Sequence, residues 1–200
     1  MAQPTGLGCA ATRSLSLVAR INEVTAVKVK LLARAAPTPE LATQTLIQEC
    51  ALTLHVSSKA QRVELRDAAN AVVWSAPVST SKFGLGEEPG SFKTPRGRHR
   101  IAEKIGDGAP LGAIFESRVF AGKIWDRKPS EQDLITTRIL WLAGDEECNQ
   151  WTHNRYIYFH GTNHEDEIGT PASHGCIRMT NDDMKILFEK VPVNTPVYIE

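Results

Sequence analysis

The chain has 200 residues, of which 42% are apolar, so it is long enough to form one well-packed domain or a domain with an appendage. Lysine plus arginine and aspartate plus glutamate number 23 each, and this balance excludes the strong overall field that draws a protein onto nucleic acid or an anionic membrane. No apolar stretch approaches the roughly 18 residues of a membrane span, so the sequence predicts no transmembrane segment.

The N-terminal quarter of the chain differs from the rest. Residues 1–36 scatter charged and polar side chains among short apolar clusters, which makes a poor secretory signal. Pro37 and Pro39 mark a break, and residues 40–50 are predicted to form a short helix after it. We therefore predict that residues 1–50 are an N-terminal extension, poorly ordered or partly helical, and that residues 51–200 form the main domain.

From Ala51 onward the pattern is typical of strands. Apolar and polar residues alternate over 52–56 and 62–66, as they do in a sheet with one face in water. Asp67 to Asn70 is predicted to form the turn of a hairpin that continues through residues 72–74. The glycine- and proline-rich stretch 83–97 is predicted to be a loop.

The second half of the domain is also predicted to be mainly strand. Further strands are expected over 98–103, 138–142 and 155–159. Two segments, 106–110 and 125–132, are predicted to be connections. We expect the loop over 106–110 and an insertion over 122–132 to form a lid over the site described below.

A helix is predicted near the C-terminus. Asn181 has the side chain of an N-cap, aspartates follow it in the first turn, and apolar residues recur at helical spacing until Pro192 ends the pattern. Residues 197–199 are predicted to form a last strand. The fold class is therefore mainly β, with a few short helices.

Two histidines bracket one cysteine in this chain. Cys176 lies two residues after His174, and His160 lies upstream. A neighbouring imidazole that takes the thiol proton, or lies nearby as a cation, raises the fraction of reactive thiolate. If residues 174–176 are extended, both side chains share one face, and Gly175 lets another backbone or a substrate approach closely. The pattern predicts a cysteine nucleophile.

His160 follows an alternating aromatic run, so it is predicted to lie at a strand end, where a loop over 161–172 brings Cys176 back to face it. We expect His160 to accept the thiol proton, in preference to His174. The backbone N–H groups of Gly175 and Cys176 are candidates for stabilising an oxyanion.

Other residues of the site are expected to support this chemistry. Ser173, Gly161 and Thr162 are predicted to shape the site and to hydrogen-bond the histidine. Arg178 is predicted either to bind a substrate carboxylate through its planar fork or to form a structural salt bridge.

A zinc site is an alternative, since His160, His164, His174 and Cys176 are residues that zinc accepts. The pair His160 and His164 shares a face only on a helix, whereas residues 161–163 favour a loop, so we predict no metal and no cofactor. The remaining histidines are expected to face solvent: His55, His99, His153 and His164.

The chain resembles a known family at four segments. His160-Gly161-Thr162, followed by Ser-His-Gly-Cys-Ile-Arg-Met at 173–179, resembles the signature of the L,D-transpeptidase catalytic domain, the YkuD-like family. Thr-Pro-Arg-Gly at 94–97 resembles the family's Thr-Pro-x-Gly segment, with Arg96 a departure where a small or hydroxyl residue is common. Residues 77–80 and 181–199 resemble a preceding strand end and the closing helix and strand.

This resemblance implies a fold and an activity. The fold would be a β-rich, sandwich-like domain, and the enzyme a cysteine-dependent acyltransferase of the cell envelope. Cys176 would attack a peptidoglycan stem tetrapeptide, release D-alanine from a thioester acyl-enzyme and form 3-3 cross-links. Alternatives with the same acyl-enzyme are an L,D-carboxypeptidase and an enzyme that attaches an envelope protein to peptidoglycan. A non-catalytic envelope-binding module is a further alternative.

The resemblance also implies a location and partners. The location would be the periplasm or cell envelope. The partners would be peptidoglycan stem peptides, with an envelope protein as an alternative acceptor. The role would lie in peptidoglycan biosynthesis, cell wall organisation and cell shape. The cysteines imply no disulfide framework, although a bridge between Cys50 and Cys148 is an open alternative.

Overall fold

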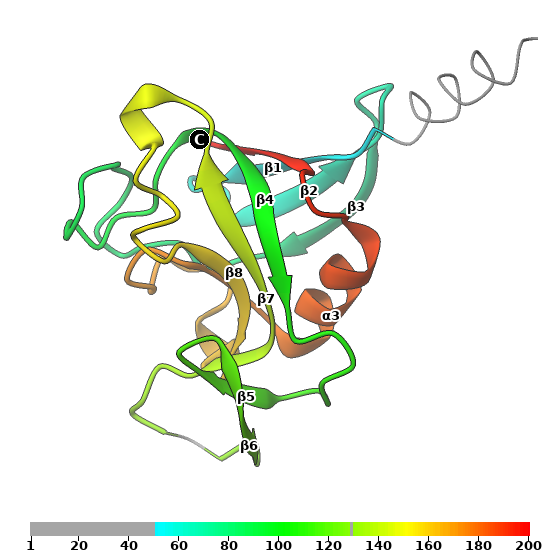
Figure 1. The fold of residues 1–200 in the computed structure, drawn as a ribbon, viewed down its shortest axis with the longest axis vertical. Helices are drawn as coiled ribbons and strands as arrows, with labels where there is room; N and C mark the ends of the chain where they lie inside the picture. The colour runs from blue at the N-terminus through cyan, green and yellow to red at the C-terminus, as the bar shows by residue number, and fades with distance from the viewer. Residues whose placement is uncertain (1–50, 129) are drawn as a thin grey trace, which may run out of the picture. The chain divides into compact units, whose positions relative to one another are not determined.

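The computed structural model describes residues 51–128 and 130–200 (Figure 1). The predictions for residues 1–50, including the helix over 40–50 and a bridge from Cys50, lie outside the described residues. Within the described part, no helix is both long and apolar enough to cross a membrane.

Ten strands and one α-helix make up most of the described part. In chain order they are β1 (Thr53–Ser57), β2 (Arg62–Arg66), β3 (Val72–Pro77), β4 (Gly97–Ile105), β5 (Ala113–Glu116), β6 (Val119–Ile124), β7 (Ile135–Gly144), β8 (Tyr158–Thr162), β9 (Ile177–Met179), α3 (Asn181–Lys190) and β10 (Pro196–Ile199), with short 3-10 turns at Glu147–Asn149 and Glu165–Glu167. The mainly β prediction is confirmed.

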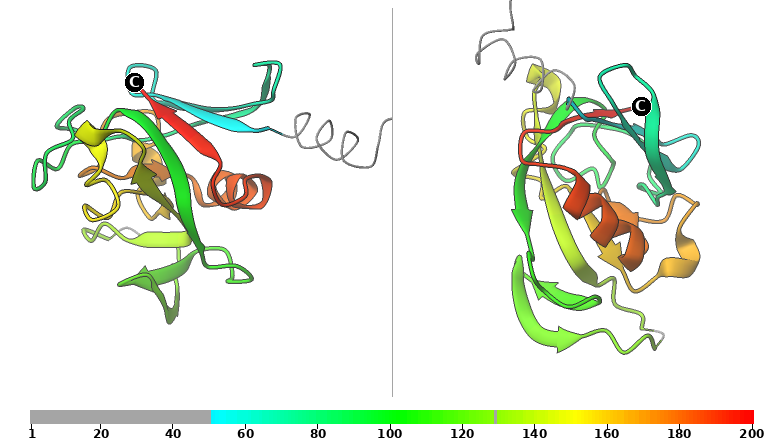
Figure 2. Two further views of the ribbon diagram at one scale, coloured as in Figure 1. Left: turned by 45° about the horizontal axis from the view of Figure 1, so that its top comes forward. Right: turned by 90° about the vertical axis from the view of Figure 1, so that its right-hand side faces the viewer.

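The strands form one mixed sheet in the order β3-β2-β1-β10-β4-β7-β5-β6, and β8 joins β7 to β9 off this path. β1 pairs with β10 and β8 with β9 in parallel, whereas the other pairs are antiparallel. The sheet curls, so that β1, β2 and β10 lie across from β8 and β9 (Figure 2). The sheet therefore has an enclosed inner face and two outer faces.

The predicted first hairpin is confirmed. β1 and β2 alternate buried and less buried residues, and β2 turns into β3 at Asp67. The Asp67 carboxylate accepts hydrogen bonds from the N–H groups of Ala69 and Ala71, both at 2.9 Å, as an Asx turn requires. The predicted loop over 83–97 is also confirmed up to its last residue, where β4 begins.

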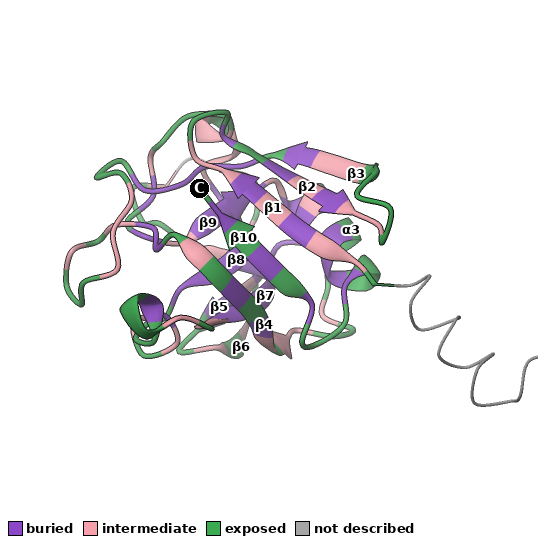
Figure 3. Cartoon of the chain, turned by 90° about the horizontal axis from the view of Figure 1, so that it is seen from above, coloured by how far each residue is buried: buried purple, intermediate pink, exposed green. Residues whose placement is uncertain are grey.

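The main core fills the enclosed face of the curled sheet (Figure 3). Burial of this apolar surface is the dominant force that holds the layers together. Its members come from every strand except β5 and β6, from α3 and from three adjoining loop positions: Leu54, Val56, Val63, Leu65, Ala76, Val78, Ile101, Leu140, Leu142, Ile157, Phe159, Ile177, Met179, Met184, Leu187, Phe188, Val191, Val197 and Ile199.

The predicted C-terminal helix is confirmed, but its cap is not the predicted one. The N-cap is Thr180, whose hydroxyl oxygen accepts the N–H of Asp183 at 3.2 Å, and Asn181 is the first helical residue. Because Thr180 caps the helix, the buried Asn181 side chain is free to hydrogen-bond to the strands. The helix ends at Lys190, just before Pro192, as expected.

A second, smaller core lies on the outer face of β7 and β8. It contains Ala113, Phe115, Ile139, Trp141 and Tyr158. The hairpin of β5 and β6 supplies the first two, and this hairpin was not predicted from the sequence. The predicted connection over 125–132 begins directly after β6, and residues 122–124 of the expected lid segment belong to β6. Residues in β6 are mostly exposed and do not alternate, so the usual strand signal is absent.

Candidate active site

The register of β8 and β9 sets which residues share the outer face. Phe159 aligns with Ile177 and His160 with Arg178, and side chains alternate along each strand. Phe159 and Ile177 point into the main core, so His160 points to the opposite face. Cys176 packs against the second core, on that same face. From strand spacing and rise, the Cα atoms of His160 and Cys176 lie roughly 8 Å apart as diagonal neighbours.

His160 lies in the middle of β8, and the prediction that it lies at a strand end was wrong. Pairing with β7 extends β8 to Thr162. The imidazole is buried, and its Nδ1 lies 2.8 Å from the carbonyl oxygen of Gly161. A carbonyl only accepts, so Nδ1 carries the proton and Nε2 carries the lone pair. Burial lowers the pKa of His160, which keeps the ring neutral and ready to accept a proton.

Cys176 is half-buried, and its thiol donates to the carbonyl oxygen of Tyr156 at 3.4 Å. Tyr156 has a φ of 59°, an uncommon value for an aromatic residue, and the second core borders the sulfur. Burial raises the pKa of the Cys176 thiol to about 11. The resting thiol is therefore neutral, and nucleophilic attack requires a base.

The segment from Ser173 to Cys176 is a tight bend, so the condition that residues 174–176 are extended is not met. Gly175 has a φ of 126°, which residues with a side chain rarely adopt. The Ser173 hydroxyl donates to the Cys176 carbonyl at 2.6 Å and accepts the Gly175 N–H at 3.2 Å. Ser173 thus shapes the site, although it bonds to the bend and not to a histidine.

His174 lies in the bend and not in a strand, so the alternation that would place it on one face with Cys176 does not apply. Its side chain is exposed, and its ring centroid lies 5.9 Å from that of Phe83 and 6.2 Å from that of Phe92. Both phenylalanines are also largely exposed. His174 is thus surrounded by exposed aromatic rings, whereas the His160 ring is buried and has its Nδ1 at a carbonyl oxygen.

The two backbone N–H groups expected to bind an oxyanion differ. The Gly175 N–H is engaged with Ser173, while the Cys176 N–H has no acceptor among residues 51–128 and 130–200. Thr94 fixes the bend from the other side, because its hydroxyl donates to the Gly175 carbonyl at 2.9 Å. The free donor at Cys176 is the group available to a developing negative charge.

Arg178 is 3% exposed and forms two ion pairs, with Asp133 and Glu167, each at 2.6 Å. Of the two alternatives for Arg178, the structure therefore displays the salt bridge. Its guanidinium ties the start of β7 and the loop after β8 to β9, next to Cys176.

Asn181 is a supporting residue that sequence reasoning assigned only as a cap. Its Nδ2 donates to the Thr162 carbonyl at 2.9 Å, and its Oδ1 accepts from the hydroxyls of Thr136 and Thr137. The hydroxyl oxygen of Thr162 accepts the His164 N–H at 3.1 Å, and among the described residues no hydrogen bond joins Thr162 to the His160 ring, contrary to the prediction. Asn181 thereby fixes the strand end that follows the base.

Gly161 is needed for close packing under this network. A Cβ at Gly161 would lie 2.6 Å from Asn181 Oδ1 and 2.9 Å from the Thr136 carbonyl oxygen. We expect Gly161→Ala to lower the free energy of unfolding by about 2 kcal/mol, an overpacking cost. Urea denaturation measures it. Gly86→Ala is the matched control, because its added Cβ meets the flexible end of Lys93 and should be nearly neutral; equal losses would contradict the packing argument.

The remaining histidines have structural surroundings. His99 is buried, with Nδ1 3.0 Å from the Gly97 carbonyl and Nε2 3.2 Å from the Thr152 hydroxyl, so the prediction that it faces solvent was wrong. His164 Nε2 lies 3.2 Å from the Gln132 carbonyl oxygen. In the described part of the chain, no group of three or more histidine, cysteine or acidic residues is arranged to hold a metal ion.

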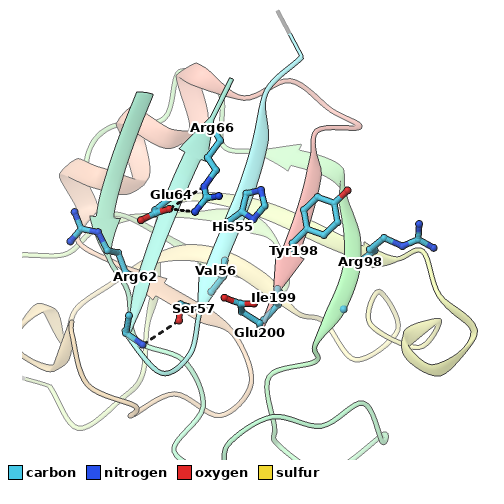
Figure 4. Close-up of a pocket in the computed structure, with 12 residues that line it drawn as sticks. His55, Val56, Ser57, Arg62, Glu64, Arg66, Arg98, Tyr198, Ile199 and Glu200 are labelled. Atoms are coloured by element: carbon cyan, nitrogen blue, oxygen red, sulfur yellow. Dashed lines mark hydrogen bonds and ion pairs between the residues drawn. The ribbon is translucent and has the colours of Figure 1, made fainter. Parts of the chain in front are cut away.

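A hollow of about 470 Å³ lies on the other outer face, over β1, β2, β4 and β10 (Figure 4). His55 and Tyr198 stack at its floor with ring centroids 5.1 Å apart, and Arg62 and Arg98 are among the residues at its sides. None of the residues lining it belongs to the bend that carries Cys176. The hollow is therefore separate from the candidate active site.

Comparison with known families agrees with this geometry. Residues 52–199 match the profile of the L,D-transpeptidase catalytic domain, YkuD. The chain belongs to this family. It is 56% identical to the probable L,D-transpeptidase YbiS of Escherichia coli K12 over 43 residues, which are 22% of the chain and 14% of YbiS. It is 48% identical to the putative L,D-transpeptidase YqjB of Bacillus subtilis 168 over 59 residues, or 30% of the chain and 32% of YqjB. These matches span less than a third of the chain and about a third or less of each relative.

Solved L,D-transpeptidase structures share the fold. The enzyme from Mycobacterium smegmatis superposes with a TM-score of 0.50 and 18% identity, covering 75% of this chain and 58% of that one. The enzyme from Xylanimonas cellulosilytica superposes with a TM-score of 0.50 and 16% identity, covering 75% and 60%. The family and the fold implied by the sequence resemblance are confirmed.

Proposed function

We propose that this L,D-transpeptidase domain is a cysteine-dependent acyltransferase that acts on peptidoglycan stem tetrapeptides in the cell envelope. The observation that carries the proposal is the placement of Cys176 and a neutral, buried His160 on one face of adjacent strands. Cys176 is the nucleophile and His160 the base. No cofactor takes part in this scheme.

In the first step, the Cys176 sulfur bonds to the carbonyl carbon of the third-position diamino acid. The bond from that carbon to the nitrogen of the terminal D-alanine breaks. The thiol proton passes to His160 Nε2 and then to the leaving amine. The Cys176 N–H stabilises the oxyanion of the tetrahedral intermediate. The products are a thioester acyl-enzyme and free D-alanine.

In the second step, an amine attacks the thioester, a new amide forms and the thiol is restored. When the amine belongs to a second stem, the product is a 3-3 cross-link, the outcome that we propose. Water in place of the amine gives an L,D-carboxypeptidase, and an amine on an envelope protein gives attachment of that protein. The reaction would take place in the periplasm and contribute to cell wall organisation and cell shape.

The resting site starts as a neutral pair. The thiol donates to the Tyr156 carbonyl, so the Cys176 side chain must rotate toward His160 Nε2 before the proton moves. An ordinary histidine has a pKa of about 6.5, and burial lowers the pKa of His160 below that value. The base form of His160 therefore persists at pH values at which an ordinary histidine would be protonated. In this arrangement the Cys176 thiol is activated when it passes its proton to His160 during the attack. A mechanism with a preformed thiolate would not need this step.

We expect slow alkylation of Cys176 by iodoacetamide in the absence of substrate. With a pKa of about 11, its thiolate fraction at neutral pH is roughly 300-fold below that of an ordinary cysteine near 8.5. The alkylation rate should therefore still rise about tenfold per pH unit between about pH 8 and about pH 10, as measured by peptide mass spectrometry. A rate that is already constant below about pH 8 would indicate a thiolate paired with imidazolium and contradict this activation scheme.

The test of the proposed function is intact-protein mass spectrometry after incubation with a disaccharide-tetrapeptide, with and without an acceptor stem. The expected adduct on Cys176 has lost D-alanine, and the acceptor resolves it to a cross-linked dimer. Resolution only to the tripeptide would establish the carboxypeptidase. No adduct and no D-alanine release from folded protein would overturn the acyltransferase and favour the binding module.

A further inference from the structure

The turn between β5 and β6 has a sequence that its conformation disfavours. Glu116 pairs with Val119, so Ser117 and Arg118 form a two-residue connection. Both have positive φ, 49° and 67°, as in a type I′ turn. Such turns favour Asn-Gly, because other residues are strained there. A strained backbone at an arginine suggests a role for the Arg118 side chain at this position.

Aromatic rings fix the Arg118 guanidinium. Its Cζ lies 4.9 Å from the ring centroid of Tyr156 and 5.0 Å from that of Trp141. The two rings are themselves in contact, with centroids 5.7 Å apart. Contact with the Tyr158 hydroxyl also raises the pKa of Arg118. The side chain is therefore held in one place by cation–π contacts.

This guanidinium has no carboxylate partner among the described residues, since none lies within 4.0 Å of it. Glu103 is close enough to raise the pKa of Arg118, but its carboxylate lies 3.2 Å from His153 Nε2. The two flat faces of the guanidinium are the surfaces that contact aromatic rings. Its N–H groups lie along the edges of the guanidinium plane, where they can bind a planar carboxylate.

Tyr156 links Arg118 to the nucleophile. Its carbonyl accepts the Cys176 thiol proton at 3.4 Å, and its ring lies against Arg118. Tyr158 also contacts Arg118. Phe159 aligns with Ile177, so the preceding residues of the two segments, Tyr158 and Cys176, also lie level with each other. The guanidinium thus contacts both the residue that bonds the thiol and the residue level with Cys176.

We propose that Arg118 binds the free C-terminal carboxylate of the peptide donor, one residue beyond the carbonyl that Cys176 attacks. This inference rests on the proposed function and names the group that selects the donor. In a tetrapeptide that loses its last residue, the carboxylate is separated from the attacked carbonyl by that residue alone, about 3.8 Å of chain. Arg118 would thereby distinguish a chain end from an internal peptide bond.

The test compares a tetrapeptide with a free C-terminal carboxylate and the same peptide as its C-terminal amide. Acylation rates of the wild-type protein and of Arg118→Gln are measured over a range of donor concentrations. We expect Arg118→Gln to raise the half-saturating concentration of the acid about 10- to 100-fold, the range for a lost charge-assisted pair, and to leave the amide unchanged. Arg62→Gln, on the opposite outer face (Figure 4), is the matched control and should change neither.

Arg118→Gly separates recognition from folding. Glycine fits the positive φ, so this variant should melt at the same temperature as the wild type or higher, yet lose the preference for the acid. Equal effects of the Arg118 substitutions on acid and amide, or none, would overturn the inference. Calorimetric binding of both peptides to Cys176→Ala, with and without Arg118→Gln, measures recognition without turnover. An Arg118-dependent preference there, with no acylation of the wild type, would overturn the proposed function and leave the inference standing.

Discussion

Cys176→Ala is expected to abolish acylation by the tetrapeptide and release of D-alanine. The rate should fall by at least about 10⁴-fold, since removing a nucleophile that acts with its base leaves only binding and oxyanion stabilisation. The fold should survive, because the side chain is half-buried and alanine leaves the Ser173 and Gly175 bonds intact. Intact-protein mass spectrometry and a D-alanine assay measure the loss, and circular dichroism verifies folding.

Cys148→Ala is the matched control. Cys148 is the other cysteine in the described part of the chain, it is exposed, and its sulfur lies 3.7 Å from a Glu146 carboxylate oxygen, away from the bend. This variant should be acylated like the wild type. Retained D-alanine release by Cys176→Ala would sink the nucleophile assignment. A binding module would retain its function in both variants.

The sequence predicted those parts of the fold that local chemistry determines. The alternation in β1 and β2, the Asx turn at Asp67 and the helical spacing before Pro192 each depend on near neighbours. The cysteine motif was recognised because residues 173–176 are consecutive in the chain, although the bend that they form was not predicted. The roles of these residues were harder to predict, because the positive φ of Gly175 breaks the alternation on which the shared face of His174 and Cys176 depended.

What the sequence did not predict depends on contacts between distant segments. His160 lies in mid-strand because β7 pairs with β8 as far as Thr162. β7 itself has a register shift between Thr136 and Ile139, with Thr137 at a φ of 67°. Such a bulge redirects a strand, and the second core with its β5–β6 hairpin lies on that side. Arg118 lies in the turn of this hairpin, and no sequence motif indicated that the turn lies near the site.

Arg178 is the residue whose two alternatives have the most different consequences. It belongs to the family signature at 173–179, and its buried fork contacts two carboxylates, Asp133 and Glu167. These carboxylates are 37% and 42% exposed, so water can solvate them when the arginine is lost. We therefore expect Arg178→Met to lower the free energy of unfolding by about 2 kcal/mol, less than the 3 to 5 kcal/mol typical of breaking a fully buried pair.

Urea denaturation measures this loss. The free energy of unfolding of Arg178→Lys should lie between those of the wild type and Arg178→Met, because lysine keeps the charge without the bidentate fork. At temperatures where Arg178→Met is folded, its preference for the acid donor over the amide donor should equal that of the wild type. A normal free energy of unfolding together with a lost preference would assign the substrate carboxylate to Arg178 instead. The two arginines thus divide the roles that the signature alone left open, with Arg178 anchoring the loops beside Cys176 and Arg118 facing the donor.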